Sequence, residues 1–114
     1  MTRDEAMQLP PARSASRALF DAHRFSEPLV IRGWQAGDRF SPKGMRGRTK
    51  KLQDLFTDLK LQRDERREVP LLVAPEGILW VVGKREDDRF VVRESTSSCL
   101  VVTVTMKDER EGAL

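Results

Sequence analysis

The sequence predicts an α+β domain that is mainly β: a small antiparallel β-sandwich, or an open barrel, with one or two short helices packed on it. Two observations support this fold class. After Pro70 the chain alternates short runs of Val, Ile and Leu with polar turns at roughly ten-residue spacing. Before Pro70, one short segment has clear helical periodicity. At 114 residues the chain is long enough for one domain with one core.

The N-terminal part contains a lead segment, a strand and a loop. Residues 1–17 hold Pro10-Pro11 and little apolar periodicity, which predicts a poorly ordered lead or linker before a domain at residues 18–106. The run PLVIRGW, residues 28–34, predicts a strand. Residues 40–47 contain one proline and two glycines, so they are expected to form a shaped loop.

An amphipathic helix follows the loop. Four apolar residues have the spacing of one helix face: Leu52, Leu55, Phe56 and Leu59. Thr49 is the expected N-cap, and Lys60 suits the negative pole at the helix end. A second short helical turn is predicted over residues 64–67, ended by Pro70.

The second half of the chain predicts strands. Four β-rich runs cover residues 71–73, 78–82, 90–92 and 100–104. The segment Pro75-Glu76-Gly77 predicts a tight turn between the first two, and KREDDR (residues 84–89) a charged connector between the second and third. Residues 107–114 are expected to be a frayed tail.

The composition of the chain indicates the cellular compartment and the state of its single cysteine. The sequence has no run of 18 apolar residues, and acidic residues interrupt its first 20 positions, so it predicts neither a membrane span nor a secretory signal. The single cysteine, Cys99, lies in a strand-like run and is expected to be a small buried side chain. These features favour a reducing, cytoplasmic compartment.

Positive charge is concentrated in one stretch. Residues 39–67 hold ten Lys or Arg against four Asp or Glu, a balance of +6, whereas the whole chain is +3. Five cations lie within nine residues that contain no acidic residue: Lys43, Arg46, Arg48, Lys50 and Lys51. A cationic cluster just before a helix is unfavourable for the helix dipole. A solvated basic surface is the plain alternative, but this focused charge favours contact with a phosphate backbone.

An ordered series of residues resembles the C-terminal domain of the bacterial tRNA(Ile)-lysidine synthetases. The series is Trp34, Gly37-Asp38-Arg39-Phe40, Pro42, Gly44-Met45, Lys50-Lys51-Leu52, Asp54-Leu55-Phe56, Lys60, Arg66, Pro70, Trp80-Val81-Val82-Gly83 and Arg85. The resemblance covers residues 20–105. It implies a β-rich sandwich of the type shared with part of the phenylalanyl-tRNA synthetase β subunit.

The resemblance also implies a role in tRNA recognition. In that family the C-terminal domain helps to hold the tRNA body near the acceptor stem, and tRNA(Ile) is the expected partner. Lys60 and Arg66 match family positions, so they rank above Arg63 and Arg67 as RNA contacts. The candidate RNA-binding set is therefore Lys43, Arg46, Arg48, Lys50, Lys51, Lys60 and Arg66.

One departure from the family bears on catalysis. The full enzymes carry a Gly-rich SGGxDS phosphate loop in an N-terminal ATP pyrophosphatase domain, and no glycine here has a strand–Gly-rich loop–helix context. This chain alone is thus expected not to synthesise lysidine and to need no cofactor. It is either an excised domain or a free-standing product, and its Met1 start favours the second.

Other polar and aromatic residues are assigned structural roles. Asp38 is expected to cap a turn and to pair with Arg39, and Phe40 to lie in the core. Trp34 and Trp80 favour core packing over base stacking, because a chain with seven aromatic residues supplies a poor stacking surface.

No catalytic or metal-binding constellation is predicted. His23 has no Cys or His partner at ligand spacing, and Asp87-Asp88 fits a solvated turn. The alternative to RNA binding is a free-standing protein-interaction module that docks onto a partner carrying the ATP-pyrophosphatase domain. Salt dependence separates the two, because phosphate binding weakens steeply as salt rises.

Overall fold

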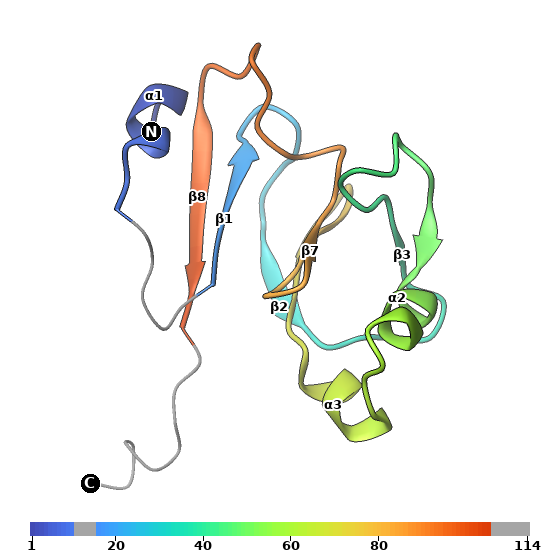
Figure 1. The fold of residues 1–114 in the computed structure, drawn as a ribbon. Coiled ribbons are helices and arrows are strands. Elements are labelled where there is room, and N and C mark those ends of the chain that lie inside the picture. Colours follow the sequence, from blue (N-terminus) through green and yellow to red (C-terminus); the bar gives the residue numbers. More distant parts are fainter. Residues whose placement is uncertain (11–15, 106–114) are drawn as a thin grey trace, which may run out of the picture.

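The computed structural model describes residues 1–10 and 16–105 (Figure 1). Within these ranges the helices are α1 (Arg3–Met7), α2 (Leu52–Asp58) and α3 (Arg63–Glu68). The strands of the same ranges are β1 (Ser16–Asp21), β2 (Val30–Arg32), β3 (Arg39–Phe40), β4 (Lys50–Lys51), β5 (Leu71–Ala74), β6 (Gly77–Val81), β7 (Arg85–Glu86) and β8 (Cys99–Val104).

The described strands form three antiparallel sheets. The largest has the order β2-β5-β6-β7, and two-stranded ladders join β1 to β8 and β3 to β4. In Figure 1 the β1–β8 ladder lies on one side of the central sheet, and α2 with β3 on the other. The predicted class, a mainly β α+β domain of antiparallel sheets with short helices, is confirmed.

The two inner strands of the central sheet, β5 and β6, are buried on both faces because their side chains alternate between two apolar clusters. In β5, Leu71 packs with Phe56 of α2, whereas the next residue, Leu72, packs with Phe20 of β1. In β6 the register shifts opposite Leu72, so that Leu79 has no directly paired residue in β5. This extra residue explains why two consecutive β6 side chains, at 79 and 80, join the same cluster.

The N-terminal segment differs from the predicted poorly ordered lead. Residues 3–7 form α1, whose N-cap Thr2 accepts a hydrogen bond from the Glu5 N–H. The Cys99 N–H donates to the Met1 carbonyl at 2.7 Å, which fixes the chain start against β8. Residues 11–15 of the predicted lead and the predicted tail at 107–114 lie outside the described residues.

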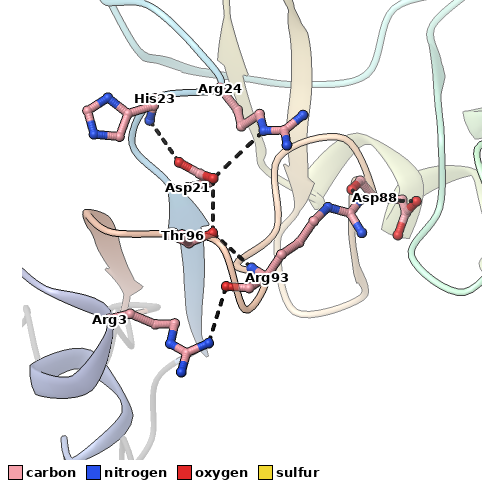
Figure 2. Close-up of polar contacts among 7 residues, drawn as sticks. All are labelled: Arg3, Asp21, His23, Arg24, Asp88, Arg93 and Thr96. Atoms are coloured by element: carbon pink, nitrogen blue, oxygen red, sulfur yellow. Dashed lines mark hydrogen bonds and ion pairs between the residues drawn. The ribbon is translucent and has the colours of Figure 1, made fainter.

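A polar network joins α1, the end of β1 and the segment before β8 (Figure 2). The buried Asp21 carboxylate accepts hydrogen bonds from the Thr96 hydroxyl at 2.9 Å and the His23 N–H at 3.0 Å. The Arg93 N–H donates to Thr96 Oγ1, and Arg3 donates to the Arg93 carbonyl. Burial alone would raise the pKa of Asp21, but these hydrogen bonds lower it overall.

The predicted helices are present, with two corrections at α2. Lys51, not Thr49, is the N-cap residue, and its side chain makes no cap hydrogen bond. Leu59 follows the last helical residue and is 42% exposed, so the apolar face consists of three residues, Leu52, Leu55 and Phe56. The second turn, predicted over 64–67, is α3, which opens with a capping box between Gln62 and Glu65.

Two predictions for the C-terminal half are wrong. Residues 90–92 form no strand, because Val91 makes a single isolated bridge to Phe20. The segment 84–89, predicted as a charged connector with Asp87-Asp88 in a solvated turn, instead contains β7 and the fully buried Asp87. The Asp87 carboxylate holds the Arg89 guanidinium through two hydrogen bonds of 3.0 and 2.9 Å.

Candidate nucleic-acid interface

The loop at residues 41–49, between β3 and β4, is fixed at its base by the segment around β7. The Ser41 N–H donates to Asp87 Oδ2 at 2.8 Å, and the Asp88 N–H donates to the Ser41 carbonyl at 2.7 Å. Two residues on, the Lys43 N–H donates to the Glu86 carbonyl at 3.0 Å. Because Ser41 and Asp87 are both buried, the loop begins from a rigid platform.

Backbone geometry then turns the loop outward. Gly44 and Gly47 have φ angles of 93° and 80°, which L side chains rarely adopt. Arg46 between them also has a positive φ, 53°, although it carries a side chain. Arg46 and Arg48 are exposed and line a shared hollow of about 210 Å³ with Gly44 and Met45. The loop therefore presents two of its three cations side by side.

The short β3–β4 ladder adds a pair of cations that face each other. Arg39 pairs with Lys51, and Phe40 with Lys50. Residues opposite each other in an antiparallel pair point to the same face, and like charges there are destabilising. Lys50 is different: its ammonium group forms an ion pair with Asp58 of α2. Lys51 is exposed and Lys50 is half-buried. The two adjacent lysines, predicted together as RNA contacts, therefore lie in different environments.

Arg39 belongs to this surface, although the candidate set did not include it. We name the exposed cations of the hairpin and its loop the basic loop surface: Arg39, Lys43, Arg46, Arg48 and Lys51. Within the described part of the chain none of the five forms an ion pair. The signal that points to Arg39 is its register opposite Lys51, which the sequence does not reveal.

Lys60 lies beyond the other end of α2 and occupies an unusual position. The Leu61 N–H bonds the Phe56 carbonyl and the Lys60 N–H bonds the Thr57 carbonyl, both at 3.0 Å. This is a Schellman motif, whose left-handed residue is usually glycine. Lys60 takes that role with a φ of 57° and is exposed. The described residues other than glycine with positive φ are Arg46 and Lys60, and both are candidate RNA contacts.

Arg66 is half-buried and turned back toward α2. Its Nε donates to the Leu61 carbonyl at 3.0 Å, and Nη2 lies 3.4 Å from Thr57 Oγ1. This position gives Arg66 a structural role in joining α3 to the end of α2. The structure thus gathers the loop cations at one end of α2 and places Lys60 and Arg66 at the other.

Other predicted structural residues are placed as follows. Asp38 caps the turn by accepting the Gln35 N–H, but its charged partner is Arg32, not Arg39, through hydrogen bonds of 2.8 and 3.0 Å. Burial would raise the pKa of Asp38, but Arg32 and the Gln35 N–H hold it below its ordinary value. Phe40 and Trp80 are buried as predicted, whereas Trp34 is only partly buried.

The structure also places the single cysteine of the chain. Cys99 is buried in β8, and burial, followed by the nearby Asp21 charge, raises the pKa of its thiol. In residues 1–10 and 16–105 no group of three or more His, Cys, Asp or Glu side chains could hold a metal ion. No helix in the same ranges is long and apolar enough to cross a membrane.

Comparison with known proteins gives a consistent result. The model of the TilS substrate C-terminal domain matches residues 29–102. The tRNA(Ile)-lysidine synthase of Parabacteroides distasonis is 42% identical over 84% of this chain, and that of Symbiobacterium thermophilum is 42% identical over 90%. These matches span 22% and 21% of the two relatives, so the chain corresponds to about a fifth of their length.

A solved structure supports the same assignment at the level of fold. The crystal structure of a TilS C-terminal domain superposes with a TM-score of 0.67 at 30% identity, covering 89% of this chain and 79% of that one. The resemblance drawn from the GDRF, PxGM and KKLxDLF residues is therefore confirmed. The chain belongs to the TilS C-terminal domain family.

Proposed function

We propose that this domain binds tRNA through the basic loop surface, with Lys60 as a further contact. One observation carries the proposal: Arg39 and Lys51 are held opposite each other without an ion-pair partner among the described residues. Such a pair costs stability, and a bound phosphate would offset that cost. The loop cations Arg46 and Arg48, which share one hollow, extend the same surface.

The domain acts as a non-catalytic tRNA holder in this proposal. It contacts the backbone of the tRNA body near the acceptor stem and supports the formation of lysidine in tRNA(Ile) in the cytoplasm. The relatives that carry the equivalent domain are tRNA(Ile)-lysidine synthases, in which the matched segment makes up about a fifth of the length. Catalysis is assigned to an ATP-pyrophosphatase domain on the same or a partner chain.

The seven candidate residues differ in expected weight. Lys43, Arg46, Arg48, Lys51 and Lys60 are exposed and face solvent, so we expect them to contact phosphates directly. Lys50 and Arg66 are half-buried and bonded within the domain, to Asp58 and to Leu61. We expect these two residues to act by holding the ends of α2 in place.

The test is a binding titration with tRNA(Ile) and an unrelated tRNA at low and moderate salt. If about four phosphates are neutralised, the slope of log affinity against log salt is roughly −3.5. Arg46→Ala/Arg48→Ala should weaken binding severalfold and make the slope shallower. Lys84→Ala, which removes one exposed cation outside the surface, is the matched control for each of the two single substitutions, Arg46→Ala and Arg48→Ala.

Two outcomes oppose the proposal. One is affinity for tRNA no greater than that of an unrelated protein of the same isoelectric point. The other is an equal effect of Lys84→Ala and of a loop substitution, which would indicate non-specific attraction. The comparison of the two tRNAs then measures selectivity separately from binding.

A protein-interaction role is the second candidate, and one observation favours it. Strand β2 is an edge of the central sheet, with Val30 and Ile31 55% and 54% exposed. An edge strand with exposed apolar side chains can pair with another chain. A partner carrying the ATP-pyrophosphatase domain would bind there in a salt-resistant way, and Ile31→Lys would abolish that association.

A further inference from the structure

Arg85 of β7 is bonded to the loop that carries the basic loop surface. Its Nη2 and Nε both donate to the Lys43 carbonyl, at 2.8 and 3.3 Å. We propose that Arg85 is a positioning residue for RNA binding: it holds the loop in the shape that presents Arg46 and Arg48, and it does not contact the RNA itself. The inference rests on the RNA-binding function proposed above and adds the residue that orders the binding surface.

The carbonyl that Arg85 bonds belongs to the central peptide of a tight turn. The Met45 N–H donates to the Pro42 carbonyl at 3.1 Å, which closes a four-residue turn. Gly44, its third residue, has a φ of 93°, as a type II turn requires. Type I and type II turns differ in the orientation of the central peptide, here the one between Lys43 and Gly44. Arg85 bonds that peptide in the type II orientation and so stabilises this turn over the alternative.

A second turn continues directly from the first and carries the two arginines. The Arg48 N–H donates to the Met45 carbonyl at 3.1 Å, and both central residues, Arg46 and Gly47, have positive φ, as in a type I′ turn. A side chain at such a φ is unfavourable, so Arg46 keeps this conformation only if the surrounding loop is held in place. Because the two turns share Met45, the orientation of the first turn sets that of the second.

Arg85 also supplies the outermost attachment of the loop to the rest of the domain. The Lys43 N–H is bonded to the Glu86 carbonyl, and the Lys43 carbonyl to Arg85. In the part of the chain that the structure describes, the backbone groups of residues 44–48 form hydrogen bonds only within the loop. Arg85 is itself paired with Val81 of β6, so the loop is attached to the central sheet. A hydrogen bond from a charged donor is stronger than a neutral one, which suits this role.

Direct contact with a phosphate is the alternative role for Arg85. The residue is half-buried and forms no ion pair with another described residue, so its charge is not neutralised. The hydrogen-bond geometry favours positioning, because two of the guanidinium donors are used on one carbonyl. The two roles predict different coupling between Arg85 and the loop arginines.

A double-mutant cycle with tRNA affinity as its readout separates the two roles. Arg85→Ala in the parent domain should weaken binding about fivefold, because the loop loses its order. In an Arg46→Ala/Arg48→Ala background the same change should cost no more than about twofold, since the side chains that the loop presents are already absent. Equal losses in the two backgrounds would indicate direct contact and would overturn the inference. Lys84→Ala, which removes one neighbouring exposed cation, is the matched control for Arg85→Ala.

Gly44→Ala tests the turn without changing any charge. The added Cβ would lie 3.7 Å from the Arg85 guanidinium, an ordinary contact, but a φ of 93° is unfavourable for alanine. Gly44→Ala should therefore weaken tRNA binding by a factor similar to that of Arg85→Ala, and the two changes together should cost little more than either alone. Additive losses would contradict a shared action on the turn. Circular dichroism and thermal unfolding establish that each variant is folded.

NMR of the domain without RNA gives a readout that does not depend on binding. The amide signals of residues 44–48 should shift in Arg85→Ala and in Gly44→Ala but stay in place in Lys84→Ala. Loop signals that do not move in Arg85→Ala would overturn the positioning role.

The outcomes distinguish this inference from the function on which it rests. If the parent domain binds tRNA and Arg85→Ala binds it as tightly as Lys84→Ala does, the positioning role is overturned and RNA binding stands. Failure of the parent to bind tRNA would overturn the proposed function, and with it the role of Arg85 in binding. The NMR comparison would then still decide whether Arg85 orders the loop.

Discussion

Arg39 and Lys51 lie directly opposite each other in the β3–β4 ladder, with both side chains exposed on the same face. Two cations at this separation repel, and the ladder is too short to offset the repulsion with many other pairs. The arrangement places positive charge at the point where the loop leaves the fold.

Reversing the charge of Lys51 should raise the stability of the domain and at the same time weaken its binding to tRNA. Lys51→Glu turns the repulsive pair into an attractive one, so we expect the free energy of unfolding to rise by about 0.5 kcal/mol. The same change should weaken tRNA binding at least tenfold. Urea unfolding and binding titrations measure the two effects. Lys84→Glu carries an identical charge change outside the surface, and an equal loss of binding in that variant would count against a local site.

Substitution of Lys60 by glycine should also raise stability and weaken tRNA binding, but for a different reason. Lys60→Gly relieves the cost of a left-handed residue with a side chain, and we expect about 1 kcal/mol of added stability. Lys60→Ala loses the same charge but keeps the Cβ atom, so its stability should stay near that of the parent. Both variants should weaken tRNA binding equally. A stability gain in Lys60→Ala as large as in Lys60→Gly would refute the backbone explanation.

Asp87 should support the loop without contacting RNA. Asp87→Ala removes the acceptor for the Ser41 N–H and leaves Arg89 without its partner, at an expected cost of about 2–3 kcal/mol in unfolding free energy. Binding by the folded fraction should also weaken, because the base of the loop is loosened. Asp88→Ala, one residue away and partly exposed, should cost much less. Similar losses in the two variants would contradict the assigned role.

Acid should weaken the domain through Asp38. Its pKa in the folded state lies below the ordinary value of 3.8, so near that pH the unfolded state binds more protons. The stabilisation is therefore complete above about pH 5 and is lost as the pH falls through the folded-state pKa. Asp38→Asn should be less stable than the parent by about 1–2 kcal/mol at neutral pH. Urea unfolding as a function of pH should show that difference shrink below pH 4; a constant difference would exclude this linkage.

Local patterns predicted most of the fold. Leu52, Leu55 and Phe56 share a face whenever the segment is helical, and the runs that became β5, β6 and β8 are apolar enough to require burial. The same reasoning could not detect that Asp87 is buried, because its partner Ser41 lies 46 positions earlier in the chain. A run of charged residues such as 84–89 predicts a solvated segment, because the sequence does not show that the Ser41 N–H approaches the Asp87 carboxylate in the fold.

The candidate site was predictable in charge but not in geometry. A count of Lys and Arg indicates the loop and the start of α2, since those cations are neighbours in sequence. The pairing of Lys50 with Asp58 and the return of Arg66 to Leu61 depend on how β4 and α3 approach α2. The cross-strand position of Arg39 depends on register, which charge counting does not provide.

The attachment of the loop to residues 85–88 has a consequence for folding. The cations of the loop are contiguous in sequence, but the loop cannot take its shape until the chain has been completed well past β6 and has returned to it. Its formation is therefore a late, non-local event that belongs to the cooperative folding of the whole domain. A ligand that binds only the shaped loop would accordingly raise the melting temperature of the entire domain, by an amount that grows with the logarithm of the ligand concentration above its dissociation constant.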